Sequence, residues 1–403
     1  MTEPLVVAGR DWANDADIDS PEYNAHFEEV TSILAAKCPV ARSEVGRGYW
    51  IASGYETVKA CSQSSDPFGS PGGVQPNADP DHFVSIPQEL NPPHQTRWRQ
   101  LLADDFTPRS VRKYEAIAIE ETNLLIDEFI DEGNCEFIAD FAAQLPGRTF
   151  FPAYLGTPLD DMPRLREAVL QAMCDPVIAD RQKGYAKLSA YLEEHLHRRE
   201  QQPPRGDMVD KILVGVPDND GNPASFADKV AVVTNFTVGG LGTTTYALAT
   251  MWYHLATHPE QLKRVIEQPE IHKQVVEENF RAYPGVPATG RTLTRDYELA
   301  GRTIPEGDMI MLNWASMCLD PGHFKDPLEF DFDRHITVNP AFGTGAHRCA
   351  GAHLARMNIA TALRVWLDRI PEFTIKPGTQ PVFTAGIVRE MYDFYLEFPA
   401  GGK

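Results

Sequence analysis

The sequence is short of positive charge. Lysine and arginine together number 37 against 57 aspartates and glutamates, which gives the 403 residues a net charge of -20 at pH 7. A surface this acidic repels phosphate backbones and anionic lipid, so nucleic acid is excluded as an expected partner. The chain also lacks an apolar run long enough to cross a bilayer and a basic, then apolar, N-terminal leader. We therefore expect a cytoplasmic protein with no membrane partner.

Cysteine is also scarce, and the few cysteines are widely spaced. The six are Cys38, Cys61, Cys135, Cys174, Cys318 and Cys349. No Cys-x-x-Cys pair occurs, which in a reducing compartment argues against a disulfide framework and a structural zinc knuckle. We expect the first five to be ordinary buried thiols. Linkers, repeats and low-complexity segments are absent too, because the most polar stretches, 200–207 and 216–223, are short enough to be loops.

Helical periodicity dominates what is present. Apolar residues recur every three or four positions over 110–138 and 162–200, which predicts amphipathic helices. The longest pattern, 225–258, opens with a capping Ser225, ends before Pro259 and would span roughly 50 Å. Short strand-like segments lie at 49–53, 297–313 and 391–398. The predicted fold class is mainly α with a small β portion.

Three glycines interrupt the interior of that longest helix. Gly239, Gly240 and Gly242 each cost about 1 kcal/mol relative to alanine in a helix interior. Glycine removes side-chain bulk, so a flat or bulky ligand could approach the helix axis closely. Tight contact with another helix is the alternative explanation.

The stretch 341–356, AFGTGAHRCAGAHLAR, places one cysteine among three glycines before a predicted helix. A plain core cysteine would not require the glycines. A zinc site could use Cys349 with His347 and His353. Alternatively, Cys349 binds haem iron as a thiolate, with backbone N–H groups and the positive end of the next helix turned toward its sulfur. The glycines favour the haem interpretation, and the other two stay open at this point.

The same loop resembles the haem-binding loop of the cytochrome P450 superfamily. It matches the pattern Phe-Gly-x-Gly-x-His-x-Cys-x-Gly through Phe342, Gly343, His347, Cys349 and Gly351. Other landmarks follow in the family's order from about residue 49 to residue 398: the pair in EENFR, the segment VGGLGTTT and the segment NPPHQTRWRQLLADDFTPR. Soluble bacterial members of the camphor-hydroxylating type are the most similar.

The resemblance implies a fold, a cofactor and a reaction. Residues 1–403 would form a single P450 domain, an α-rich triangular prism with a long helix over haem b. Cys349 would be the axial ligand, and Arg99, Arg291 and His347 would hold the haem propionates. The cysteine ligand donates electron density that favours splitting of the O–O bond. The implied activity is insertion of one atom of O₂ into a C–H bond of a small hydrophobic substrate.

Structural and oxygen-pocket residues are implied in the same way. Glu278, Arg281 and Arg334 would form a fold-maintaining ion network. In the family an acid precedes the threonine that helps relay protons, but here Gly242 precedes Thr243. We expect proton delivery through water, Thr243 and Thr244 instead, and a Gly242→Asp variant should change turnover or coupling. The rival explanation is that Gly242 makes room for substrate.

Substrate and partner are expectations of the resemblance as well. Phe83 takes the place of a ketone-binding tyrosine, and the remaining candidate pocket residues are Asn235, Val238, Gly239, Pro287, Ile387 and Val388. This mostly apolar set suggests a terpenoid, a norisoprenoid or a substituted aromatic. Because the chain has no reductase extension, electrons would come from a [2Fe-2S] ferredoxin and its reductase, docking near Arg348, Arg356 and Arg364.

Two alternatives remain from the sequence. One is a haem-thiolate enzyme of the same fold that uses peroxide directly or rearranges an oxidised substrate. The other is a metal-binding or small-molecule-binding protein that uses His347, Cys349 and His353 without redox chemistry.

Overall fold

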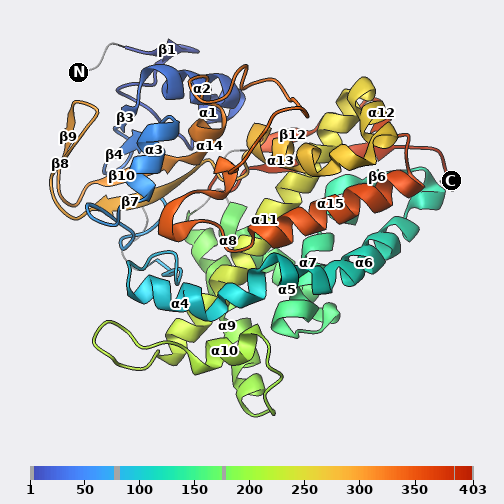
Figure 1. The fold of residues 1–403 in the computed structure, drawn as a ribbon, viewed down its shortest axis with the longest axis horizontal. Helices are drawn as coiled ribbons and strands as arrows, with labels where there is room; N and C mark the ends of the chain where they lie inside the picture. Colours follow the sequence, from blue (N-terminus) through green and yellow to red (C-terminus); the bar gives the residue numbers. More distant parts are fainter. Residues whose placement is uncertain (1–3, 77–81, 175–177, 385, 402–403) are drawn as a thin grey trace.

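The computed structural model describes residues 4–76, 82–174, 178–384 and 386–401. Helices form most of the molecule, as predicted, and most strands of the largest sheet lie on the left in Figure 1, whereas β6 lies on the right near the C-terminus. The largest sheet has the order β3-β4-β10-β7-β5, with β4 parallel to β10 and the other pairs antiparallel. These strands are Val40–Ser43, Tyr49–Ala52, Met309–Asn313, Ala288–Leu293 and Phe68–Gly69.

Smaller sheets complete the β portion. The three-stranded sheet has the order β11-β14-β6, and three hairpins pair β1 with β2, β8 with β9 and β12 with β13. Their bounds are Thr374–Ile375, Tyr395–Glu397, Asn134–Glu136, Val6–Val7, Arg10–Asp11, Tyr297–Leu299, Arg302–Ile304, Val382–Thr384 and Glu390–Tyr392. The three segments predicted as strands all contain strands.

Helix α11, Phe226–Thr257, runs through the middle of the molecule (Figure 1). Ser225 accepts a hydrogen bond from the backbone N–H of Asp228, whose carboxylate accepts one from the Ser225 N–H. This reciprocal capping satisfies two N–H groups that have no partner within the helix. The helix continues without a break through its three glycines. The predicted helix at 225–258 is confirmed.

Of the two other regions predicted to form helices, 162–200 is helical throughout its described residues and 110–138 is helical only in part. The pattern over 110–138 becomes α5, Pro108–Val111, and α6, Glu115–Asp127, and the chain then reaches Gly133 in the left-handed region at φ 70° before β6. The prediction is therefore wrong beyond Asp127. The pattern over 162–200 becomes α8, Met162–Cys174, and α9, Ile178–Glu200, which are separated by residues outside the described part.

The described residues form other helices, several of which pack against α11. The remaining helices are α1 Pro21–Ala25, α2 Phe27–Lys37, α3 Tyr55–Ser62, α4 His94–Ala103, α7 Leu145–Phe150, α10 Met208–Val214, α12 Pro259–Glu267, α13 His272–Ala282, α14 Trp314–Cys318 and α15 Ala352–Arg369. The free cysteines at 38, 61, 135 and 318 are buried as expected, while the side chain of Cys174 lies outside the described residues.

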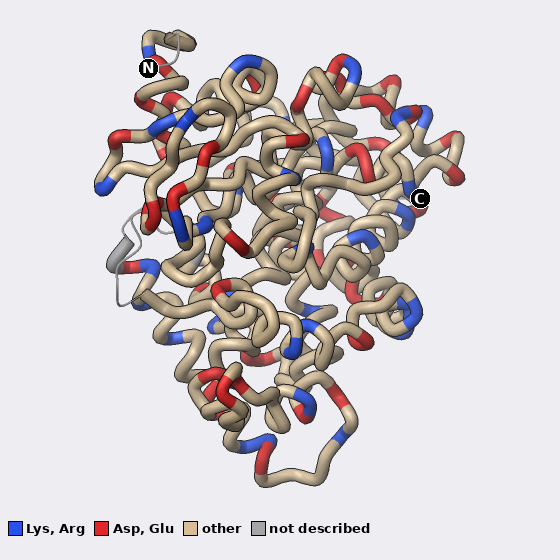
Figure 2. Tube along the Cα trace, turned by 60° about the vertical axis from the view of Figure 1, so that its left-hand side comes forward, with Lys and Arg blue, Asp and Glu red and all other residues tan. Residues whose placement is uncertain are grey.

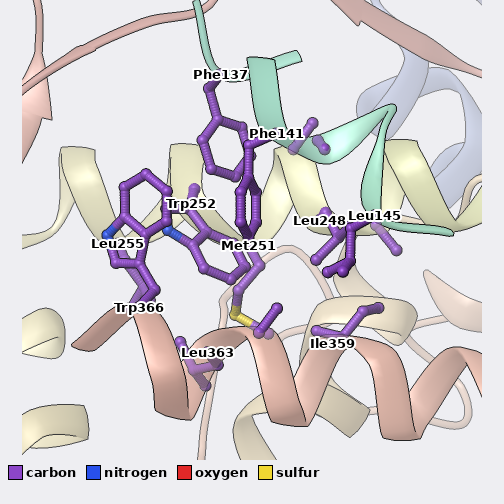
Figure 3. Packing of buried hydrophobic residues seen from close by; sticks show 14 of the residues in the cluster. Phe137, Phe141, Leu145, Leu248, Met251, Trp252, Leu255, Ile359, Leu363 and Trp366 are labelled. Atoms are coloured by element: carbon purple, nitrogen blue, oxygen red, sulfur yellow. The ribbon is translucent and has the colours of Figure 1, made fainter. Parts of the chain in front are cut away.

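An aromatic core locks α11 to α15 (Figure 3). Trp252 of α11 and Trp366 of α15 are both 0% exposed, and their rings meet edge to face at 5.6 Å. Phe137 and Phe141 pack against both indoles. Truncating one of these rings would cost about 3–5 kcal/mol. Because α15 is held this firmly, the loop that precedes its first residue is held as well.

Candidate functional site

The loop before α15 carries Cys349 to a large cavity. This cavity has a volume of about 300 Å³ and lies between the loop, α11 and α4. The backbone N–H of Cys349 donates to the Phe342 carbonyl at 2.8 Å, which closes the loop on itself. From α4, Gln95 Nε2 donates to the carbonyl of residue 346 at 2.7 Å, and an Arg99 Nη donates to that of residue 348 at 2.6 Å. Helix α4 therefore fixes the loop's shape.

Two glycines of the loop adopt backbone conformations that residues with a side chain rarely adopt. Gly343 and Gly345 have φ of 68° and 73°, in the left-handed region. A Cβ at Gly345 would lie 2.1 Å from the Ser62 carbonyl oxygen. The loop therefore approaches α3 more closely than a side chain allows. Gly351 has φ -79° and is the N-cap of α15, where it needs no special conformation.

The Cys349 thiol is exposed to the cavity although protein surrounds it. Burial raises the pKa of this thiol, whereas the Gly351 backbone N–H and the guanidinium groups of Arg99, Arg356 and Arg348 lower it. The first turn of α15 contains no acid, so its positive end is not neutralised beside the sulfur. The environment therefore suits an anionic thiolate once a cation binds the sulfur.

Three nitrogen-rich side chains line the same cavity. Arg99, Arg291 and His347 come from α4, β7 and the cysteine loop. The pairing of β7 with β10 sets the position of Arg291, which is 3% exposed, and burial lowers its pKa to about 10. Burial and the two arginines lower the pKa of His347 to about 3, and its Nε2 lies 2.9 Å from Ser70 Oγ.

These side chains fit the haem expected from the family resemblance. Neither Arg99 nor Arg291 forms an ion pair within the part of the chain that the structure describes, and none of the described cavity-lining residues is Asp or Glu. Leaving a buried guanidinium without a counter-ion is costly. Two carboxylates of a bound ligand would supply the missing negative charge. Haem carries two propionates that would pair with these guanidinium groups. The Cys349 thiol in the same cavity would bind its iron.

Helix α11 faces this cavity through bare backbone and hydroxyl groups. A Cβ at Gly239 or Gly240 would meet no atom within 4 Å. Thr243 and Thr244 also line the cavity, and Thr243 Oγ1 donates to the Gly239 carbonyl at 2.9 Å. Gly242 does not line it, because it faces a second cavity on another side of α11.

The predicted substrate contacts divide into two groups. Asn235 and Gly239 line the cavity, whereas five residues do not: Phe83, Val238, Pro287, Ile387 and Val388. Phe83 stacks on Tyr185 with a ring separation of 5.0 Å, and Val388 and Val238 are core residues. The cavity therefore brings together two of the seven predicted contacts.

Several lining residues were not predicted. The aromatic ones are Phe106, Phe150, Phe236, Phe280, Tyr283 and Trp314. Two amides also face the cavity, Gln88 and the buried Asn358, whose Oδ1 finds no hydrogen-bond partner in the described part of the chain. Phe236 follows the predicted Asn235 on α11, and this adjacency was its only signal. The others come from segments far apart in sequence, where no local pattern marked them.

The predicted ion network is present in the core. Arg281 is 0% exposed and binds both carboxylate oxygens of Glu278, at 2.7 and 2.8 Å. Arg334 Nε reaches the same carboxylate at 3.2 Å. Arg281 also donates to carbonyls of three other residues, so the network ties α13 to the segment 318–329 that follows α14.

The features required by a zinc site or a membrane span are missing from the described residues. They contain no cluster of three His, Cys, Asp or Glu side chains able to hold a metal ion. His353 is exposed and does not line the cavity of Cys349. Within the described ranges, no helix combines the length and the apolar character that a bilayer crossing requires.

Comparisons with known proteins agree with this geometry. The family model for cytochrome P450 matches residues 153–385. Cytochrome P450 127A1 of Sinorhizobium fredii is 30% identical over 85% of this chain and 82% of its own. The crystal structures of CYP101J2 and CYP101C1 superpose with TM-scores of 0.84 at 28% and 27% identity, covering 97% and 98% of this chain and 98% and 100% of theirs. The family prediction is confirmed: this chain belongs to the cytochrome P450 monooxygenases, which bind haem through an axial cysteine thiolate.

Proposed function

We propose that Cys349 is the axial thiolate and that the chain hydroxylates a small, uncharged hydrophobic substrate. The open thiol at the cavity, beside the positive end of α15, is the single observation that carries the proposal. Haem held by these residues would supply the chemistry that inserts an oxygen atom from O₂ into a C–H bond. The protein as a whole would act as one P450 domain over residues 1–403.

Arg99, Arg291 and His347 would hold the two propionates. Their convergence from three separate elements supports this role, as does the lack of an acidic partner among the described residues. Gln95 would not contact a propionate through its Nε2, because that group is engaged by the carbonyl of residue 346. Phe342, Gly343 and Gly351 would shape the loop around the sulfur.

Thr243 and Thr244 would serve the oxygen pocket on the facing side of the cavity. The Thr243 hydroxyl donates a hydrogen bond to the Gly239 carbonyl, so the lone pairs of its oxygen can accept a hydrogen bond from water. Water and hydroxyl groups would therefore carry the protons that a carboxylate at position 242 carries in related proteins.

The cavity lining supports a neutral, mostly apolar substrate with one hydrogen-bonding group. Its walls are largely aromatic and aliphatic, while Asn235 and Gln88 offer amides that make no hydrogen bond within the described chain. An amide both donates and accepts, so a ketone or a hydroxyl group would suit it. A terpenoid, a norisoprenoid or a substituted aromatic has this character. The contacts at Phe83, Val238, Pro287, Ile387 and Val388 stay predictions.

A [2Fe-2S] ferredoxin, reduced by its own reductase, would deliver electrons on the Cys349 side. Figure 2 shows acidic and basic positions interspersed over the trace, so a docking patch must be local. Arg348 is exposed and has no ion-pair partner among the described residues, and the same holds for Arg109, Arg112 and Lys113 beside α15. Arg364 pairs with Glu115 at 3.7 Å.

The predicted role of Arg356 in docking has weaker support. Its guanidinium binds the Glu277 carboxylate and lies 4.2 Å from the centre of the Phe342 ring. These contacts anchor α15 to α13 and to the cysteine loop. We therefore assign Arg356 to holding the loop, and we assign the docking surface to Arg348, Arg364, Arg109, Arg112 and Lys113.

A peroxide-using enzyme of the same fold is a second candidate. The observation that favours it is the absence of any Asp or Glu among the described residues that line the cavity. Such an enzyme would turn over with peroxide and without ferredoxin, which separates the two candidates directly.

A reduced-plus-carbon-monoxide absorption spectrum tests the proposal. The purified protein should show the band of thiolate-ligated haem, and Cys349→Ser should lose it. Cys318→Ser, which changes a buried cysteine that does not line the cavity, is the matched control and should retain the band. A colourless protein that does not take up haem, or an unaltered band in Cys349→Ser, would reject the assignment. Titration with terpenoids and aromatics, followed by the spin-state change, would then identify the substrate class.

A further inference from the structure

A second cavity, of about 310 Å³, borders α11. Leu241, Gly242, Thr245, Tyr246 and Ala249 line it, whereas residues 239, 240, 243, 244 and 247 line the cavity of Cys349. At 100° per residue these two sets occupy nearly opposite faces of the helix. Helix α11 is therefore a partition between two cavities.

The two cavities differ in charge. The second cavity contains Glu136 of β6, Glu390 of β13, Asp393 and Arg166 of α8, whereas the Cys349 cavity has no acid among its described lining residues. Arg166 Nε is buried and has no hydrogen-bond partner among the described residues, although both glutamates interact electrostatically with the guanidinium. Buried polar atoms of this kind are usually satisfied by water. This cavity has charged groups on its wall and is roomy enough to hold water.

The two glutamates are held differently. The Glu136 carboxylate accepts the backbone N–H groups of Ala139 at 2.5 Å and Phe394 at 3.1 Å, so it fixes local backbone. Glu390 is 7% exposed, and its carboxylate accepts the hydroxyl of Tyr392, which is 39% exposed. Glu390 is thus a buried acid whose hydrogen-bond partner, the Tyr392 hydroxyl, belongs to a side chain that is partly exposed to solvent.

The partition is thinnest at the three glycines. Gly239 and Gly240 leave open space on the Cys349 side. On the other side, a Cβ at Gly242 would meet only Val388 Cγ1, at 3.9 Å. Bare backbone therefore separates the cavities over this one turn, next to Thr243. The cost of about 1 kcal/mol per glycine in a helix interior needs a compensating role, and close approach of water from both sides provides one.

We propose that Glu390 is a proton-supplying residue for the oxygen pocket, acting through water in the second cavity that passes α11 at Gly242. The proposal rests on the monooxygenase function. One proton leaves the Glu390 carboxyl, passes along water and reaches Thr243 Oγ1, while the hydroxyl proton of Thr243 passes to the reacting oxygen. The Glu390 carboxylate then regains a proton from solvent past Tyr392 and Asp393. Among the described residues that line this cavity, the other charged groups are Arg166, Glu136 and Asp393.

The test compares Glu390→Gln with Glu397→Gln in the haem-loaded enzyme. Glutamine keeps the size of glutamate but cannot supply the proton, so peroxide released per electron pair should rise several-fold and the solvent isotope effect should increase. Glu397 is exposed on β14, outside the cavity, and its variant should behave as wild type. Adding Gly242→Asp to Glu390→Gln should restore coupling, because it installs an acid in the same cavity.

A second variant and a structural measurement keep the proposal testable if Glu390→Gln does not fold. Gly242→Val narrows the passage without changing charge and should raise peroxide release even if Glu390→Gln does not fold. A crystal structure should show ordered water from Glu390 to the backbone of Gly242. A dry cavity, or wild-type coupling and isotope effect in both variants, would overturn the proposal. If the carbon monoxide spectrum and substrate binding are normal in those variants, the monooxygenase function stands and this relay alone fails.

Discussion

Replacing Arg281 by methionine tests whether the buried ion network holds the fold together. The guanidinium makes two hydrogen bonds to Glu278 and three to the carbonyls of Cys318, Pro327 and Glu329, all between 2.7 and 3.0 Å. Methionine fills part of the volume but donates to none of them. The Glu278 carboxylate, 1% exposed, stays behind with less compensation.

The expected loss follows from these contacts. Removing one partner of a buried ion pair costs about 3–5 kcal/mol, because the remaining charge is left in a poorly solvating interior. Arg334 Nε at 3.2 Å and the Asp331 N–H at 2.9 Å still reach Glu278, so the loss should fall near 3 kcal/mol, at the lower end of that approximate range. This is a large share of the roughly 5–15 kcal/mol that stabilises a typical protein.

Urea unfolding of the haem-loaded protein, followed by circular dichroism, measures the change. Arg198→Met is the control, because Arg198 pairs with Glu194 one helical turn away at 2.9 Å but is 48% exposed. Exposed helical pairs contribute only about 0.3–0.5 kcal/mol, so this variant should differ little from wild type. Equal losses in the two variants would refute the reasoning. The double variant Glu278→Gln/Arg281→Met should recover part of the loss, since it removes the buried Glu278 charge while Arg334 keeps its hydrogen bonds to the carbonyls of residues 325, 326 and 329.

Three further predictions concern the site. Asn235→Leu should weaken binding of a ketone or alcohol substrate by about 1–3 kcal/mol in spectral titrations and leave a hydrocarbon of the same shape unaffected; equal effects on both would contradict its hydrogen-bonding role. Arg348→Glu should slow ferredoxin association more at low than at high ionic strength, and an effect independent of salt would exclude docking there. Gly345→Ala should lower haem retention on a desalting column because its Cβ would clash with the Ser62 carbonyl; full retention would show that the loop can move away from α3.

Features encoded by neighbouring residues were predictable. The cap at Ser225 and Asp228, with Pro259 beyond the end, placed α11 within one residue of its observed bounds. The cysteine loop was recognisable because its glycines and Cys349 lie within ten consecutive positions. The helix expected to continue to Ile138 failed because the left-handed Gly133 and the pairing of β6 with β14 override the local apolar periodicity.

Features that depend on tertiary geometry were not predictable from the sequence. Gln88 and Phe150 reach the cavity only because distant segments meet there, and no local pattern marks them. The direction in which Gly242 faces is set by the rotation of α11 within the fold. A one-residue step along the helix turns a position by 100°, so Gly242 and Thr243 open onto different cavities although they are adjacent in sequence.

The charged side chains that line the Cys349 cavity are positive, whereas the chain as a whole is acidic. This difference connects cofactor binding with the role of Gly242. In a protein with a net charge of -20, the described lining of the Cys349 cavity holds Arg99 and Arg291 and no acid. A carboxylate there would pair with these arginines and compete with the propionates for them. Acids placed behind α11 avoid this competition, because the helix backbone separates them from the arginines. Protons from those acids would then reach the oxygen pocket through water that passes the helix at its glycines.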